Sequence, residues 1–442
     1  MLILSLEMEK HRVFTLSVIT FIFLIVMLIQ INKFDVQKSY KQYQNSSVKP
    51  NVYTYHPGGI APSISEGSPD ATHVIGNFSL NVPDNFTGSL KKGSKTLKMR
   101  KDCVINILIF KKGQSMIGRK QGTYKCKELG CNFRLSYSTN PKALIGKQIV
   151  LLYLRSKWDW QELLKVRPPN QIWIFYCRES PLHDQGIVPP SWLLRTTYNW
   201  TMTYRSDSTI NAAYGAYIPG EPEIAINDTR NWAAKKTKLV AWMASNCNMQ
   251  GWPRTTFVKT FSQKYLKVDM FGSCGTLTCP KGKRCQNILS RYKFYFALEN
   301  SLCTEYITEK FWRNALLYGS VPIVFGATRE DYERLAPPNS FIHLSDFDSP
   351  EKLRDYLLKL DGNDTLYNQY FEWKKYGRLQ MMAIGRLFLP KTFCEMAAKY
   401  LETQNKLEPT VTYELPSLKM WWQRSCNKIY NVPVVVKVLN GK

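Results

Sequence analysis

Acidic residues are scarce in this chain. Its 34 Asp and Glu residues are outnumbered by 60 Lys and Arg residues, which gives a formal charge of +26. Such a balance is typical of proteins that bind nucleic acid. The basic residues are scattered, however, and no nucleic-acid-binding motif is present. We therefore expect no nucleic-acid partner. Attraction to an anionic nucleotide or to a membrane surface fits better, and most of these charges fit a solvated surface.

Cysteine is absent from the first 102 residues. All eleven cysteines lie between Cys103 and Cys426, as expected of disulfides formed in an oxidising compartment. Three of them lie in the loop 274–285, which has no histidine nearby and no C-x-x-C pair, so a zinc site there is disfavoured. We expect disulfides instead, with Cys303 as a candidate partner for the loop. Since eleven is odd, one cysteine should be free or intermolecular.

Charge is also absent from residues 13–31, which are almost wholly apolar. As a helix they would span about 28 Å at about 1.5 Å per residue. The apolar core of a cleaved signal peptide is usually shorter, about 7–15 residues, and ends in small residues. We therefore predict a cytosolic tail over 1–12 and an uncleaved transmembrane signal-anchor over 13–31.

Glycosylation sequons indicate the orientation of this anchor, which the flanking charges leave open. Each N-x-S/T tripeptide is weak alone, but six follow the apolar segment. They begin at Asn45, Asn77, Asn85, Asn199, Asn227 and Asn363. Together with the cysteines they predict a type II, single-pass membrane protein with a lumenal body.

The body is predicted to contain two α/β domains and no internal repeat. Residues 32–100 are rich in Asn, Ser, Gly and Pro and are typical of a flexible stem. Two Rossmann-like domains, 101–236 and 237–402, would then face each other across a cleft (a GT-B-type architecture), followed by a tail, 403–442. Short apolar runs predict buried strands over 104–110, 149–154, 172–176, 238–243, 268–271, 295–298, 321–325 and 341–344.

One segment of the second domain carries a chemical signal. An apolar run that ends at Leu298 is followed by apolar residues at 307, 311 and 315, a helical spacing that Gly319 would stop. A strand at 321–325 comes next. Ligands of doubly wound sheets bind beyond the carboxyl ends of the strands. Glu309 and Lys310 would lie there in the first turn of the helix, a natural seat for a diphosphate.

This segment, 294–326, resembles the donor-binding signature of the α1,3-fucosyltransferases, which use GDP-fucose. The similarity covers roughly residues 100 to 400, through Arg167–Pro181, Asn199–Ser208, Tyr214-Gly215 and Val240–Asn248. It implies inverting transfer of L-fucose to an N-acetylglucosamine of a glycoprotein or oligosaccharide acceptor. It implies no tightly bound cofactor.

Three features depart from the family pattern. Gly251-Trp-Pro-Arg254 replaces the usual Ala-Arg pair, so the role of Arg254 depends on the alignment. Ala397 stands where a second cysteine commonly follows the one matching Cys394, so that disulfide must differ, with Cys426 as a candidate. The long loop 274–285 looks like that of invertebrate members, including those that modify the N-glycan core.

The resemblance also assigns roles to residues. Inversion needs a base for the acceptor proton, for which we choose Glu179 of the Glu-Ser-Pro turn, with His183 as a rival. Arg254 and Lys310 would hold the departing diphosphate, and Glu309 would accept bonds from sugar hydroxyls and orient Lys310. The predicted donor-binding residues are Tyr204, Arg205, Tyr214, Ser245, Asn246, Cys247, Asn248, Arg254, Tyr295, Asn300, Tyr306, Glu309 and Lys310.

Two other functions stay open at this point. Asp346-Phe347-Asp348 is a D-x-D, with which many transferases of other nucleotide sugars bind Mn²⁺. Because the next residues predict a helix capped by Asp or Ser, with Pro350 in its first turn, we favour capping and predict no metal site. A divalent cation would then stimulate only through the nucleotide. The third candidate is a non-catalytic glycan-binding membrane protein. Two acceptors stay open, the N-glycan core and lactosamine-type (Lewis) termini, and the oligomeric state is not predicted.

Overall fold

The computed structural model describes residues 103–441, except 111–119, 128, 154–158, 184–197, 248–250, 281, 382, 385–386, 389, 406–414 and 428–430. The predicted anchor and stem, the sequons at Asn45, Asn77 and Asn85, and Asn248 therefore lie outside the described residues. In the part of the chain that is described, every helix is too short or too polar to cross a bilayer.

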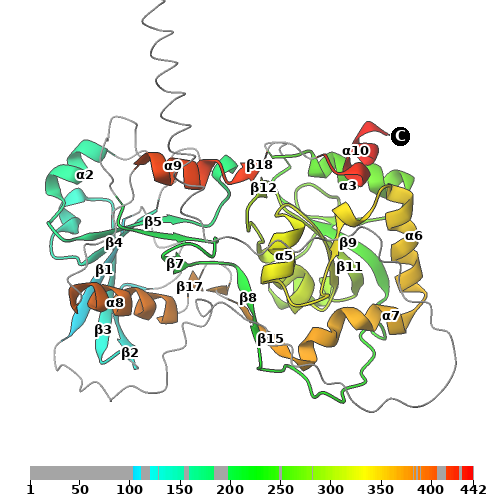
Figure 1. Ribbon diagram of the computed structural model, residues 1–442, viewed down its shortest axis with the longest axis horizontal. Helices are drawn as coiled ribbons and strands as arrows, with labels where there is room; N and C mark the ends of the chain where they lie inside the picture. The colour runs from blue at the N-terminus through cyan, green and yellow to red at the C-terminus, as the bar shows by residue number, and fades with distance from the viewer. Residues whose placement is uncertain are drawn as a thin grey trace, which may run out of the picture. The chain divides into compact units, whose positions relative to one another are not determined.

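The first sheet has seven strands in the order β2-β3-β1-β4-β5-β6-β7 (Figure 1). All neighbours are parallel except the hairpin of β2 and β3. The strands are β1 (Val104–Phe110), β2 (Gly122–Cys126), β3 (Cys131–Ser138), β4 (Ile149–Tyr153), β5 (Ile172–Cys177), β6 (Trp200–Thr203) and β7 (Ile210–Asn211).

Both faces of this sheet are buried, and side chains alternate between them along each strand. In β5, Ile172 and Ile174 face a cluster completed by α8 (Pro390–Asn405). Trp173 and Phe175 face the opposite cluster, completed by α2 (Trp160–Val166) and α9 (Leu415–Gln423). The structure thus differs from the predicted domain boundary at 402, because α8 and α9 return to the first sheet.

The second sheet has five parallel strands in the order β10-β9-β11-β13-β14. They are β9 (Lys238–Met243), β10 (Asp269–Phe271), β11 (Tyr292–Leu298), β13 (Val321–Phe325) and β14 (Ile342–His343). One face packs on α3 (Arg254–Lys264), α6 (Pro350–Asp361) and α10 (Pro433–Asn440). The other packs on α4 (Lys283–Leu289), α5 (Arg329–Leu335) and the π-helix η3 (Lys310–Leu317). The α/β prediction is confirmed.

Short elements connect and flank the two sheets. Antiparallel pairs join β8 to β15, β12 to β18 and β16 to β17. These strands are β8 (Gly215–Pro219), β12 (Leu302–Cys303), β15 (Gly377–Met381), β16 (Ala383–Ile384), β17 (Leu387–Phe388) and β18 (Cys426–Asn427). The remaining helices are η1 (Pro141–Leu144), η2 (Pro181–His183), η4 (Leu344–Asp346), α7 (Asp364–Asn368) and η5 (Gln369–Lys375).

Five disulfides use ten of the eleven cysteines. The pairs are Cys103–Cys131, Cys126–Cys394, Cys247–Cys274, Cys279–Cys285 and Cys303–Cys426. The expectation of disulfides rather than zinc in loop 274–285 is confirmed, but two proposed pairings are wrong. Cys303 does not join the loop, and Cys394 does not pair with Cys426. The eleventh cysteine, Cys177, is buried at the end of β5.

Candidate active site

The predicted base Glu179 lies two residues beyond the carboxyl end of β5. Its Oε1 accepts hydrogen bonds from Tyr306 Oη and from Asn300 Nδ2, the latter at 3.2 Å. Beside it, Ser180 Oγ lies 2.6 Å from Ser301 Oγ. The loop after β5 is therefore bonded to the loop after β11, which brings three predicted site residues together.

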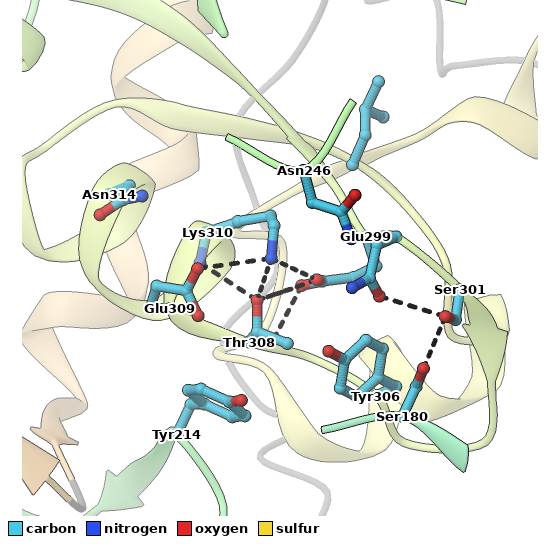
Figure 2. Close-up of polar contacts among 12 residues, drawn as sticks. Ser180, Tyr214, Asn246, Glu299, Ser301, Tyr306, Thr308, Glu309, Lys310 and Asn314 are labelled. Atoms are coloured by element: carbon cyan, nitrogen blue, oxygen red, sulfur yellow. Dashed lines mark hydrogen bonds and ion pairs between the residues drawn. The ribbon is translucent and has the colours of Figure 1, made fainter. Parts of the chain in front are cut away.

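The densest charge cluster lies where β11 ends and η3 begins (Figure 2). Glu299 is fully buried and follows the last residue of β11. Its Oε1 accepts from Thr308 N at 2.8 Å, and its Oε2 accepts from Lys310 Nζ at 2.9 Å. The Thr308 hydroxyl lies 2.8 Å from both carboxylate oxygens and from Lys310 Nζ. Glu299 and Thr308 were absent from the predicted site.

Burial and charge act in opposite directions on the pKa values of this cluster. Burial alone would lower the pKa of Lys310, but the carboxylates of Glu299 and Glu309 outweigh it and raise that pKa above its ordinary value. Burial raises the pKa of Glu299, and Lys310 offsets only part of that rise. Burial would also raise the pKa of Glu309, yet Lys310 leads the groups that bring it below the ordinary value. The ammonium is therefore held in its charged form.

Arg254 is placed beside the cluster by the segment that departs from the family pattern. Its Nη1 donates to Leu298 O at 3.0 Å and its Nη2 to Asn246 O at 2.9 Å. The Trp252 indole donates to Glu299 O at 2.8 Å, and Gly251 approaches Asn300 so closely that an added Cβ would lie 2.1 Å from its carbonyl oxygen. Gly251 is thus required by packing. Arg254 is 4% exposed, its guanidinium holds the carboxyl end of β11 and Asn246 through these two bonds, and burial lowers its pKa.

The loop after β9 supplies Ser245, Asn246 and Cys247 at the same edge of the sheet. Ser245 and Asn246 are exposed, and Figure 2 shows the Asn246 side chain beside Glu299. Cys247 is fixed by its disulfide to Cys274. Their contact with a donor stays a prediction.

The predicted aromatic residues divide into two groups. Tyr214 and Tyr306 lie at the site: Tyr214 Oη donates to Arg178 O at 2.7 Å, and the Arg178 guanidinium lies 4.1 Å from the Tyr214 ring centre. Tyr204 and Tyr295 are core residues, almost wholly buried. Tyr295 Oη accepts from Asn314 in η3 at 3.3 Å, and burial raises its pKa to about 12.

The contacts of Arg205 hold its loop against α9. It forms a two-point ion pair with Asp207, donates to Trp421 O at 3.1 Å and lies over the Trp421 ring. No contact described here joins it to Lys310. The arrangement ties the loop after β6 to α9, and donor binding by Arg205 stays a prediction.

The two carboxylates of the D-x-D take part in a capping hydrogen bond and in ion pairs. Capping was the role that the sequence favoured for this motif. Asp346 accepts from His343 N and pairs with Arg329, and Asp348 pairs with Lys352 at 2.7 Å. Ser349 is the N-cap of α6 and Pro350 its first residue. Among the described residues, no group of three or more His, Cys, Asp and Glu side chains is arranged to hold a metal ion. His183, the rival base, lies in η2.

The three described sequons differ in exposure. Asn227 and Asn363 are exposed. Asn199 is 8% exposed, and its Oδ1 accepts from Trp173 N and from Arg167 Nη2, each at 2.8 Å. Asn199 therefore connects β5 to the start of β6, and glycosylation there stays a prediction.

Family models match both halves of the chain. The model "Fucosyltransferase, N-terminal" matches residues 103–215, and "Glycosyltransferase family 10 (fucosyltransferase) C-term" matches residues 233–421. The chain belongs to glycosyltransferase family 10.

Named relatives agree with this assignment. A Drosophila melanogaster glycoprotein 3-alpha-L-fucosyltransferase A is 43% identical over 263 residues, 58% of this chain and 49% of its own. A Mus musculus alpha-(1,3)-fucosyltransferase 4 is 39% identical over 215 residues, 48% of each chain. The chain thus spans about half the length of these curated relatives. A crystal structure of an α1,3-fucosyltransferase with GDP-fucose aligns over 71% of this chain and 94% of its own, with 16% identity and a TM-score of 0.43.

Proposed function

We propose that this protein is an inverting glycosyltransferase that moves L-fucose from GDP-fucose, in α1,3 linkage, to an N-acetylglucosamine of glycoprotein glycans. One observation carries the proposal: Glu179, at the end of β5, is hydrogen-bonded to Asn300 and Tyr306 beside the buried Lys310 cluster. The base therefore bonds to residues of the same chain segment, 299–310, that carries the fixed cation. The two sheets would face each other across a cleft as in a GT-B-type enzyme.

The reaction needs one displacement. Glu179 takes the proton of the acceptor hydroxyl as its oxygen bonds to the anomeric carbon. The bond from that carbon to the β-phosphate oxygen breaks, and GDP leaves with both electrons of the bond. Lys310 stabilises the charge that develops on the diphosphate, with Arg254 behind it. Glu309, 37% exposed at its side chain, is placed to accept bonds from the sugar hydroxyls.

For the acceptor, we favour the N-glycan core over lactosamine. The match to the fly glycoprotein 3-alpha-L-fucosyltransferase covers 58% of this chain. A Homo sapiens 4-galactosyl-N-acetylglucosaminide 3-alpha-L-fucosyltransferase matches 47% at the same 43% identity. A Gorilla gorilla gorilla enzyme with the same 4-galactosyl-N-acetylglucosaminide description matches 58% of this chain, but at 38% identity. At equal coverage, the higher identity supports the glycoprotein type.

The test is product analysis with the full chain in detergent, GDP-fucose, EDTA and both acceptors in one reaction. Fucose on the core N-acetylglucosamine supports the whole proposal. Fucose on lactosamine alone keeps the chemistry and overturns the acceptor. Transfer only without EDTA favours a metal-dependent enzyme, and no transfer by folded protein favours a glycan-binding role.

We also propose that the chain is a type II Golgi membrane protein. The uncharged run 13–31, the exposed sequons at Asn227 and Asn363 and the five disulfides support a single span with a lumenal body. Loss of mobility-shifting glycans from Asn227→Gln and Asn363→Gln variants expressed in cells would test the lumenal location. Unchanged mobility of both variants would count against it.

A further inference from the structure

All three N–H groups of the Lys310 ammonium have acceptors in this structure. They are Glu299 Oε2 at 2.9 Å, Thr308 Oγ1 at 2.8 Å and Glu309 Oε1 at 3.4 Å. An ammonium has three donors and no acceptor. A bound diphosphate must therefore take one N–H from an acceptor that now holds it.

The three acceptors are unequal. Glu299 is fully buried and Thr308 is 1% exposed, whereas the Glu309 side chain is 37% exposed and makes the longest contact. Water can replace Lys310 at Glu309 but not at Glu299, where an unpaired buried carboxylate would be costly. Glu309 is therefore the acceptor that Lys310 can exchange for a phosphate oxygen.

Glu299 is held from several directions, so it cannot follow Lys310 if the lysine moves. Thr308 N and Oγ1 donate to Oε1, and the Trp252 indole holds the Glu299 carbonyl. Gly326 packs so closely that an added Cβ would lie 2.6 Å from the Glu299 Cβ. The carboxylate is a rigid anchor at the end of the central strand β11.

We propose that Glu299 and Thr308 are positioning residues that fix Lys310 by two N–H groups, and that the third N–H passes from Glu309 to the diphosphate of the donor. This rests on the proposed use of GDP-fucose. It adds Glu299 as the carboxylate that orients Lys310 and refines the predicted role of Glu309, which also contacts Lys310. Glu309 becomes an exchangeable partner, free to turn to the sugar once the phosphate holds Lys310.

This arrangement predicts how GDP binding depends on pH in the native protein and in a Glu299 variant. The charged groups that face Lys310 are Glu299, Glu309 and Arg254. Glu299 raises the pKa of Lys310 against burial and against Arg254, so the native lysine stays cationic through alkaline pH. Without Glu299, burial lowers this pKa, and the cation is lost as the pH rises.

Calorimetric titration of the full chain with GDP and, separately, with guanosine tests this. Glu299→Gln should weaken GDP binding about tenfold at pH 7, the loss of one charged contact. The loss should grow toward pH 9.5, with guanosine binding unchanged. Glu309→Gln should bind GDP no more weakly than native protein, because the competing acceptor loses its charge.

Thr308 gives a second variant pair if Glu299→Gln folds poorly. Thr308→Val should lose GDP affinity and Thr308→Ser should restore it, since the hydroxyl is what Lys310 uses. The exposed Glu372→Gln is the control. Native GDP affinity in both Glu299→Gln and Thr308→Val, equal losses for GDP and guanosine, or a greater loss in Glu309→Gln than in Glu299→Gln would overturn the inference. Failure of the native protein to bind GDP would instead overturn the proposed function.

Discussion

The two sheets present different chemistry at their carboxyl ends. After β5, the first sheet offers one carboxylate, Glu179, whose described side-chain partners are the neutral groups of Tyr306 and Asn300. After β11, the second sheet offers a group of two carboxylates and two cations, in which Glu299 is fully buried and Glu309 is partly exposed. A base must accept a proton and give it up, so neutral partners suit it. A phosphate-binding cation must stay charged and in place, so buried ion pairs suit it.

The largest effect on activity is expected when the base alone is removed. Glu179→Gln keeps an acceptor for Tyr306 and Asn300 but cannot take a proton. We expect kcat to fall by about 10²–10⁴, while calorimetry shows GDP affinity unchanged. Glu162→Gln, an exposed carboxylate of α2, is the matched control. A fall of less than tenfold would exclude Glu179 as the base.

Lys310→Met, unlike Glu179→Gln, should weaken the binding of GDP. It removes the phosphate-binding charge and leaves Glu299 buried without its cation. GDP binding should weaken by about 10–100-fold, as when a charge-assisted contact is lost. The Kd measured for GDP decides the matter: native affinity in folded Lys310→Met would show that the cluster is structural.

Sequence patterns predicted the strands of both regions, because strand propensity depends on residues that are neighbours in the chain. Val321–Phe325 and Lys238–Met243 have the predicted bounds. Gly319 stops η3 with a φ of +75°, as expected of a left-handed cap. The places of Glu179 and Lys310 in the fold agree with the same pattern, since both residues come after predicted strands.

The rest depends on contacts between distant residues. Glu299 stands in the signature, but only the fold shows that its carboxylate turns inward to Lys310. The apolar stripe of α8 could pack on either sheet, and its disulfide, Cys126–Cys394, joins residues 268 apart. Spacing does not give cysteine connectivity. The π-helical form of η3 is likewise a property of its packing.

A smaller effect on activity is expected at Glu305, which joins the loop after β6 to α5. Glu305 has a φ of +57°, unusual for a residue with a side chain. It accepts from Ser206 Oγ at 2.6 Å, after β6, and pairs with Arg334 of α5. Glu305→Gln should lower the free energy of unfolding by about 1–3 kcal/mol and reduce kcat with little change in GDP affinity.

Urea denaturation measures that loss, with Glu372→Gln as the control. The Glu372 side chain is 51% exposed and pairs with Lys375 one helical turn away, so its change should stay within about 0.5 kcal/mol. Equal stability of the two variants would show that the tie between Ser206 and Arg334 contributes nothing. Weakened GDP binding in Glu305→Gln would place Glu305 in the donor region instead.

The smallest effect on activity is expected at the D-x-D, whose acidic groups serve the second sheet only as caps and ion pairs. Asp348→Asn loses an exposed pair with Lys352, and such pairs contribute about 0–1 kcal/mol. Asp346→Asn loses the Arg329 pair and weakens the cap at His343 N. Neither change reaches the Lys310 cluster, so kcat/KM for GDP-fucose should stay within about twofold of native, a range well under 1 kcal/mol. Its response to EDTA and added Mn²⁺ should be the same in all three proteins. Loss of activity in Asp346→Asn and Asp348→Asn, restored by excess Mn²⁺, would replace the buried lysine with a metal as the group that holds the diphosphate.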